Sequence, residues 1–248
     1  MRKSALTTIL ILLAAATFVK AQGEVAQAEK LNDEGVARIN AGNYTQAAEA
    51  LERAVALRPD YAKAFYNLGT ARFHLKQWIP AANALQKAID LSPGYAEAYN
   101  QLGVVYLETG QNKKAIEAFK TATRLRADDA IAFYNLGCAY MRMERFGEAV
   151  GALETAKRLD KGNPEIRFNL GAAYARRDRF RDAIAELREA AALAPADEEI
   201  QLFLGNLYLR ARDRDAAAAQ YAAMKFTNPG LAEKLYHALN SGKIVRVP

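Results

Sequence analysis

Four primary amides recur along the chain at a constant spacing of 34 residues: Asn67, Gln101, Asn135 and Asn169. A primary amide carries both a hydrogen-bond donor and an acceptor, so it can pair with the backbone of an extended peptide whatever that peptide's sequence. The residues directly before these amides are Tyr66, Asn100, Tyr134 and Phe168. Aromatic rings add contact area at a low cost in conformational entropy. Amides beside rings are suited to binding a polypeptide.

Three arginines keep the same spacing: Arg142, Arg176 and Arg210. Stacked one above another, they would form a basic stripe for an acidic or carboxylate-bearing partner. The alternative is that each arginine ends a helix, where the helix dipole favours a cation in any case. Both interpretations stay open, and we expect the amides and the arginines to face solvent when no partner is bound.

No arrangement of side chains typical of catalysis accompanies these residues. The single cysteine, Cys138, cannot form an internal disulfide and has no neighbouring base at helical spacing. The two histidines, His74 and His237, lie far apart and lack metal-ligand companions. Neither a phosphate-binding glycine loop nor a nucleophile elbow occurs, and we expect carboxylates such as Glu186 to be solvated. The sequence therefore predicts a protein that is not an enzyme and needs no cofactor, metal or small-molecule substrate.

The elements that position these residues are set by a repeat. Glycine recurs every 34 residues at Gly35, Gly69, Gly103, Gly137, Gly171 and Gly205. Alanine follows the same step at Ala47, Ala81, Ala115, Ala149, Ala183 and Ala217. A fixed period of this size is the signature of a stacked repeat protein. Numbering each repeat so that its glycine is position 8 places the six repeats at 28–61, 62–95, 96–129, 130–163, 164–197 and 198–231.

Each repeat is predicted to form two antiparallel helices. Positions 4, 7, 8 and 11 share one face of a first helix, and positions 20, 24 and 27 share a face of a second. A glycine or a polar pair near positions 15 and 16 separates the helices. Proline at position 32 is expected to stop the second helix. Position 8 must be small because the helices cross there, and large residues, Leu51 through Tyr221 at position 24 among them, fill the remaining space.

This pattern resembles the tetratricopeptide repeat, on the basis of Asn67-Leu68-Gly69, of Asn135-Leu136-Gly137 followed by Tyr140, and of Ala149, Leu153 and Ala156. The resemblance covers residues 28–231. It implies an all-α fold, a right-handed α-solenoid of six helix–turn–helix repeats whose first helices line a concave groove. Positions 5, 6 and 13 face the groove in that family, which makes the amides, rings and arginines its expected peptide-binding residues. The alternative is that asparagine at position 6 is simply common in this repeat.

The two ends of the chain are expected to lie outside the repeats. Residues 1–21 resemble a signal peptide, because Arg2 and Lys3 precede an apolar run that is short for a membrane span. Its removal lowers the formal net charge from +6 to +3, which excludes a nucleic-acid footprint. An uncleaved membrane anchor is the alternative. The superhelix is expected over 22–231, and a capping helix with a short tail over 232–248. Leu231, Leu235 and Leu239 would cover the open face of the sixth repeat.

Together these features predict a non-enzymatic scaffold that is exported to the periplasm or secreted, in a bacterium, and that binds a protein or peptide in its groove. One alternative is a structural or assembly subunit of an envelope complex, acting through its convex face or its tail. Another is an enzyme whose site is not recognisable from the sequence.

Overall fold

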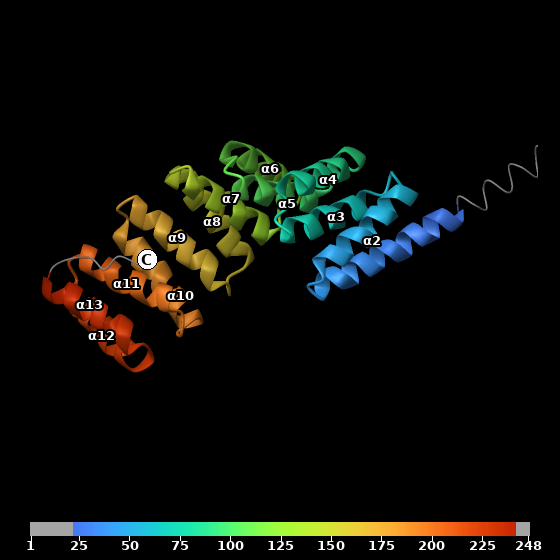
Figure 1. Cartoon of the computed structure of the whole chain (residues 1–248). Coiled ribbons are helices and arrows are strands. Elements are labelled where there is room, and N and C mark those ends of the chain that lie inside the picture. The colour runs from blue at the N-terminus through green and yellow to red at the C-terminus, as the bar shows by residue number, and fades with distance from the viewer. Residues whose placement is uncertain (1–21, 242–248) are drawn as a thin grey trace, which may run out of the picture. The chain divides into compact units, whose positions relative to one another are not determined.

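The computed structural model describes residues 22–241, which are helical with short turns and contain no strand. The first described helix spans residues 22–40. It is followed by α2 (Tyr44–Leu57), α3 (Ala62–His74), α4 (Trp78–Leu91), α5 (Ala96–Glu108), α6 (Asn112–Leu125), α7 (Ala130–Arg142), α8 (Phe146–Leu159), α9 (Pro164–Arg176), α10 (Phe180–Leu193), α11 (Glu198–Arg210), α12 (Arg214–Thr227) and α13 (Pro229–Ser241). Consecutive helices pack against each other as pairs (Figure 1). The predicted class, all-α with helix pairs packed as in a tetratricopeptide solenoid, is confirmed.

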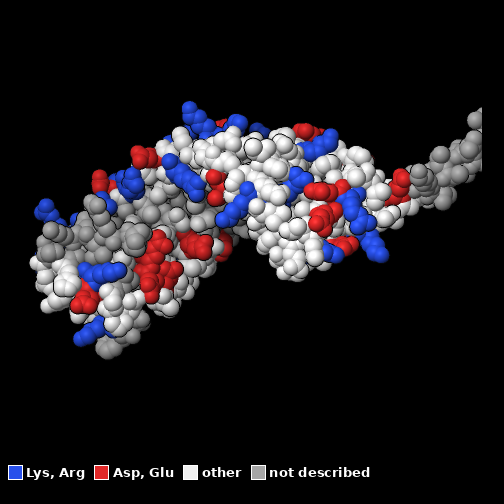
Figure 2. Space-filling model, viewed as in Figure 1, with Lys and Arg blue, Asp and Glu red and all other residues white. Residues whose placement is uncertain are grey.

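The helices form two compact units, Met1–Leu125 and Arg126–Pro248, which we call the N-terminal and the C-terminal unit. The N-terminal unit contains the first described helix and α2 to α6, and the C-terminal unit contains α7 to α13. On the face seen in Figure 2, cations and carboxylates are interspersed within each unit. The residues expected to be a signal peptide, 1–21, and the tail 242–248 lie outside the described residues.

Small residues let the two helices of a repeat approach each other closely. A methyl group added at Gly69 would lie 2.6 Å from Leu85 Cγ, and one at Gly103 would lie 2.6 Å from Phe119 Cε1. The six alanines at position 20 are fully buried, with no exposed surface. Position 8 therefore receives the side chain of position 24 in the first five repeats, as the sequence predicts.

The sixth repeat departs from this packing. A methyl group at Gly205 would meet Leu235 Cδ2 of α13 at 2.7 Å, where the other repeats present their own position 24. Tyr221 instead lies beside the ring of Tyr236, with 5.3 Å between ring centroids. The expectation that Tyr221 fills the crossing at Gly205 is wrong, because the fully buried Leu235 occupies that space. The capping helix α13 thus supplies part of the core of the last repeat.

All six turns between the helices of a repeat share one geometry. Position 15 has a positive φ in every repeat: Gly42, Lys76, Gly110, Glu144, Asp178 and Arg212. In the second repeat, Lys76 N–H donates to the Phe73 carbonyl at 2.8 Å and Gln77 N–H to the Arg72 carbonyl at 2.9 Å. This pair of bonds is the Schellman motif, in which a left-handed residue satisfies the last carbonyls of a helix. Only two of the six positions use glycine, so the turn is maintained at some cost in backbone strain.

Candidate functional site

Within each unit, the first helices of successive repeats approach one another. α3 contacts α5 in the N-terminal unit, and α7 contacts α9 in the C-terminal unit. The resemblance to the tetratricopeptide repeat assigns these first helices to the concave side. We call the surface that carries positions 5, 6 and 13 the groove face.

Asn67, the first of the four recurring amides, forms a structural contact between repeats. Asn67 Nδ2 donates to Asn32 Oδ1 at 2.8 Å, joining position 6 of the second repeat to position 5 of the first. Asn67 is 8% exposed, and Asn32 has no exposed surface. A buried amide that loses its partner costs free energy, so this pair stabilises the stack. The expectation that position 6 faces solvent is wrong at Asn67, because the neighbouring repeat covers it.

The same joint recurs in the C-terminal unit. Asn169 Nδ2 donates to the Tyr134 hydroxyl at 3.2 Å and to the Glu165 carbonyl at 2.9 Å. One repeat further along, Phe168 and Phe203 form an edge-to-face ring pair with centroids 5.5 Å apart. Each pair again links position 5 of one repeat to position 6 of the next. The joint therefore fixes the rings of Tyr134 and Phe168, which remain half-buried at the groove face.

The other predicted site residues at positions 5 and 6 also lie on first helices. Tyr66 on α3 packs against the ring of Tyr95, with centroids 5.1 Å apart. Asn100 and Gln101 on α5 are half-buried, as is Asn135 on α7. The predicted site is thus divided between the two units: Tyr66, Asn67, Asn100 and Gln101 lie in the N-terminal unit, and Tyr134, Asn135, Phe168 and Asn169 in the C-terminal unit.

Two of the three arginines also join repeats. The Arg176 guanidinium lies 4.4 Å from the centre of the Phe146 ring and pairs with Glu144 at 3.7 Å. Arg210 lies 4.9 Å from the Phe180 ring centre in the same way. A cation over an aromatic face gains roughly 0.5–1 kcal/mol at an exposed site. These arginines are therefore not wholly free for a ligand, although Arg176 keeps 55% of its side-chain surface exposed.

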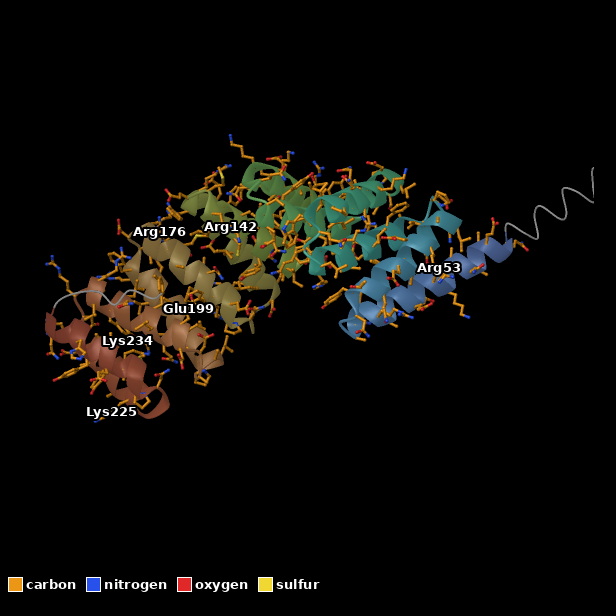
Figure 3. The ribbon with its side chains drawn as sticks, in the orientation of Figure 1. Arg53, Arg142, Arg176, Glu199, Lys225 and Lys234 are labelled. Carbon is orange, nitrogen blue, oxygen red and sulfur yellow. The ribbon has the colours of Figure 1, made fainter. Side chains whose placement is uncertain are left out.

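Arg210 completes the same arrangement through an ion pair with Asp178 at 3.7 Å. His74 takes this place in the N-terminal unit, stacked on Tyr44 with centroids 4.3 Å apart. Arg142 and Arg176 are the last residues of α7 and α9, where the helix dipole also favours a cation (Figure 3). The structure thus adds a third interpretation of these residues: Arg176 and Arg210 each contact the ring at position 17 of the preceding repeat.

Cys138 lies one helical turn from Tyr134, and the two side chains form a hydrogen bond. Burial raises the pKa of the Cys138 thiol, while the hydrogen bond from Tyr134 and the charge of Arg142 oppose that rise. Burial likewise raises the pKa of Tyr134. A thiol kept protonated is a poor nucleophile. Within residues 22–241, no group of three or more His, Cys, Asp or Glu side chains is placed to hold a metal ion.

Glu186 corrects one expectation directly. Its carboxylate pairs with Lys157 of α8 at 2.7 Å and with Arg167 of α9 at 3.0 Å. Only 14% of its side chain is exposed, so it is not the solvated residue that the sequence predicts. Three helices meet at this network, and the two cations compensate the buried charge. The network is a structural contact that joins α8, α9 and α10.

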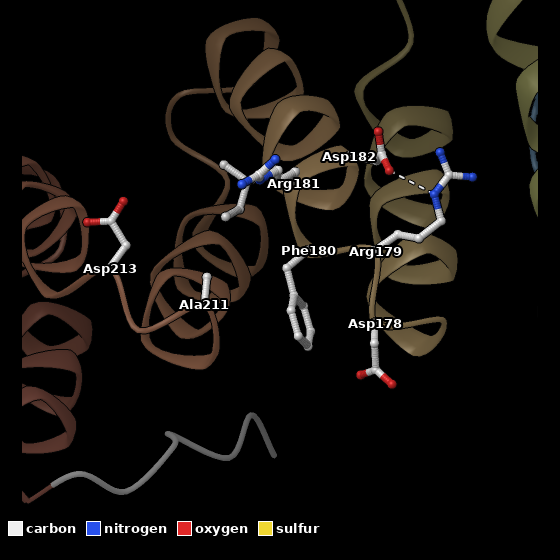
Figure 4. Close-up of a pocket in the computed structure, with 8 residues that line it drawn as sticks. Asp178, Arg179, Phe180, Arg181, Asp182, Ala211 and Asp213 are labelled. Carbon is white, nitrogen blue, oxygen red and sulfur yellow. Dashed lines mark hydrogen bonds and ion pairs between the residues drawn. The ribbon is translucent and has the colours of Figure 1, made fainter.

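A pocket of about 550 Å³ lies beside the turns that join α9 to α10 and α11 to α12 (Figure 4). Asp178, Arg179, Asp182 and Asp213 are among its lining residues. Arg179 pairs with Asp182 at 2.7 Å, Asp213 accepts the Ala216 N–H at 3.0 Å, and Asp178 pairs with Arg210. Its charged groups are thus largely used by neighbouring helices, which leaves little to specify a ligand.

Sequence reasoning missed the partners that hold the site. These are Asn32, Phe203, Tyr44, Phe146 and Phe180. A usable signal was present, because position 5 and the next position 6 are always 35 residues apart and both carry polar or aromatic side chains. Position 17 and the next position 13 are likewise 30 residues apart.

None of the described helices is long and apolar enough to cross a membrane.

Solved structures of similar fold superpose on this chain. PilF of Pseudomonas aeruginosa has a TM-score of 0.74 at 21% identity, covering 87% of this chain and 99% of PilF. YrrB, a TPR protein with an unusual peptide-binding site, has a TM-score of 0.67 at 23% identity, covering 77% and 99%. MamA of Desulfovibrio magneticus RS-1 has a TM-score of 0.63 at 22% identity, covering 69% and 97%. At these identities the likeness shows the fold alone.

A family model described as the cilia and flagella-associated protein 70 C-terminal domain, a tetratricopeptide domain, matches residues 3–235. No curated protein matches the sequence.

Proposed function

Because the chain belongs to the tetratricopeptide family of the cilia and flagella-associated protein 70 C-terminal domain, we propose that it is a non-enzymatic scaffold that binds a polypeptide partner on the groove face. Proteins of this fold are typically protein-interaction scaffolds. The partner we propose is an extended segment that lies across successive first helices.

The rings at position 5 carry this proposal. Tyr134 and Phe168 are half-buried on the groove face, one repeat apart, and each is held by position 6 of the next repeat. A ring held in place before binding loses little entropy when a ligand covers it. Position 9 beside them is small, Cys138 and Ala172, so a chain can approach the helix backbone between the rings. The rings would take apolar side chains, and Asn135 would pair with the peptide backbone.

Site-specific photo-crosslinking in the native host tests this proposal. A photoreactive phenylalanine analogue at Phe168 should form a covalent adduct with a polypeptide. The same analogue at Glu189, an exposed residue of the second helix in the same repeat, is the matched control. Adducts from position 168 alone support the groove face. Adducts from position 189 alone, or from neither position in correctly folded protein, would refute it.

We further propose that the protein is exported and processed. The basic start and the apolar run of residues 1–21 support this. N-terminal sequencing of the protein from its host should then begin at Gln22 or within a few residues of it. An intact Met1 on soluble cytoplasmic protein would contradict export without affecting the proposed groove.

A structural subunit of an envelope complex is the second candidate. An exposed apolar patch on the second helices would favour it; on α4, Ile79 is 75% exposed. Co-purification of a large complex whose contacts crosslink from second helices, and not from position 168, would select this function.

A further inference from the structure

A small pocket of about 390 Å³ opens in the N-terminal unit between α4, α5 and α6, which lie side by side (Figure 1). Tyr99, Leu102 and Tyr106 of α5 line it, at positions 4, 7 and 11 of the third repeat. These positions differ from positions 5, 6 and 13 of the groove face. Gln86 of α4 and Lys113 of α6 lie at its rim. Its volume is near the lower limit for a ligand pocket, which suits one or two side chains of a peptide.

Two tyrosine rings of the pocket wall are packed against the core. The rings of Tyr99 and Tyr106 pack against a buried cluster that includes Leu85 and Val105, so their orientations are set before any ligand binds. Both rings are half-buried. Within residues 22–241, neither phenol hydroxyl has a hydrogen-bond partner. Each hydroxyl can therefore donate to a carboxylate oxygen of a ligand.

A bridge that joins two other pairs of repeats is missing beside this pocket. Between the first two repeats, Arg72 at position 11 pairs with Glu52 at position 25 of the preceding second helix, at 2.7 Å. In the C-terminal unit, Tyr174 at position 11 bonds to Glu154 at position 25. The residue equivalent to Glu52 and Glu154 is Gln86, opposite Tyr106.

Gln86 does not bridge to Tyr106. Its Nε2 donates instead to Asp90 Oδ1 on its own helix at 2.9 Å. Within residues 22–241, no carboxylate therefore bonds to the Tyr106 hydroxyl, and a ligand carboxylate could take the place that Glu154 holds beside Tyr174.

The charges around the opening are mainly positive. Among the lining residues, α6 contributes Lys113 and Lys114 against one carboxylate, Glu117, which pairs with Lys120 at 3.1 Å. Lys114 lies 5.5 Å from the centre of the Tyr106 ring, and its ammonium donates to Gln111 at 2.9 Å. Lys113 is exposed, and no partner for its ammonium occurs within the described part of the chain. A carboxylate at the rim would be attracted by both lysines.

We propose that this pocket binds a short acidic segment of a partner polypeptide. One aromatic or aliphatic side chain of the segment inserts between Tyr99 and Tyr106, and flanking carboxylates pair with Lys113 and with the Tyr106 hydroxyl. The apolar walls supply the contact area, and the cations select acidic over basic sequences. This site is separate from the groove face, so it does not depend on the proposed groove binding.

Two fluorescein-labelled peptides test the site by fluorescence anisotropy: Asp-Glu-Phe-Glu-Asp and its basic counterpart Lys-Arg-Phe-Arg-Lys. The acidic peptide should bind the full chain at least about tenfold more tightly, because reversing the charges turns attraction into repulsion. Its affinity should fall as salt is raised, since exposed charges are screened. Equal binding of both peptides, or binding of neither, would overturn the proposal.

Variants then localise the binding. Gln86→Glu should close the pocket by supplying the missing bridge to Tyr106, and should weaken the acidic peptide by about tenfold. Lys113→Gln should weaken it about threefold, whereas Arg124→Gln, the same charge change further along α6, should have little effect. With circular dichroism unchanged, undiminished binding by Gln86→Glu, or equal losses from Lys113→Gln and Arg124→Gln, would refute the site.

Discussion

At Gly137, where α7 crosses α8, even one methyl group has no room. It would lie 2.5 Å from Leu153 Cγ and 2.8 Å from Leu153 Cδ2. Contacts this short force a packed side chain or a backbone to move, which typically costs about 1–3 kcal/mol. Gly137→Ala should therefore lower the free energy of unfolding by that amount, measured by urea denaturation.

Gly151→Ala is the matched control, because Gly151 lies within α8 and nothing stands within 4 Å of its added methyl group. Alanine is the better helix former, so this variant should be neutral or stabilised by about 0.5–1 kcal/mol. If both variants unfold at the same urea concentration, the role assigned to position 8 is wrong.

Tyr95 should make the free energy of unfolding of the N-terminal unit depend on pH in the alkaline range. Burial, with smaller contributions from Tyr66 and Glu97, raises the pKa of Tyr95 to about 12. The folded state therefore prefers the neutral phenol more strongly than the unfolded chain does. This stabilisation is fully present below pH 10, the ordinary pKa of tyrosine, and is lost as the pH rises through about 12. Unfolding measured across that window should show a weaker pH dependence for Tyr95→Phe than for the wild type; identical slopes would contradict this account.

At the scale of the helices, the six turns within the repeats share one backbone conformation although their side chains differ. Lys76 has φ of +58° and Gly110 has φ of +73° at the equivalent position. Because only glycine adopts this region without steric cost, Lys76→Gly should stabilise the fold by about 0.5–1 kcal/mol. Gly110→Ala should destabilise it by at least as much. Thermal melts that move in the same direction for both variants would be inconsistent with these turns.

The helix starts differ between the two units. Tyr61 and Tyr95 precede α3 and α5 without a side-chain capping bond. In the C-terminal unit, Asn163 accepts the Glu165 N–H at 3.0 Å and the Ile166 N–H at 3.2 Å. Asn163→Ala should therefore cost about 1 kcal/mol, and Asn163→Gly only a few tenths. Chemical denaturation distinguishes the two, and equal losses would show that the capping bonds contribute little.

Across the whole molecule, each repeat is packed mainly against its neighbours. Stability in such arrays is close to a sum of local terms, so damage spreads first to adjacent repeats. In Gly137→Ala, amide hydrogen exchange should accelerate in α7 to α10 more than in α3 to α5. Exchange that accelerates equally throughout residues 22–241 would instead indicate a single cooperative unit.

Much of this architecture was predictable from the sequence, because it depends on local chemistry repeated six times. Helix periodicity and the small residues at positions 8 and 20 predicted the helix pairs and their crossings. The proline at position 32 did not account for where the second helices end. The second helices end at position 30 in every repeat, including at Leu125 and Leu159, where no proline follows two residues later. Their common end reflects the shared packing of the repeat.

The sequence by itself determined the repeat, its helices and the face on which the amides and rings lie, since these follow from spacing along one chain. Only the tertiary structure decided what those side chains contact. Asn67 bonds to Asn32, Arg176 covers Phe146, and Leu235 takes the place expected for Tyr221. Each of these contacts joins residues from different repeats or from the capping helix. Their formation depends on how neighbouring helices stack. The sequence pattern of one repeat does not give the distance between side chains that belong to different repeats.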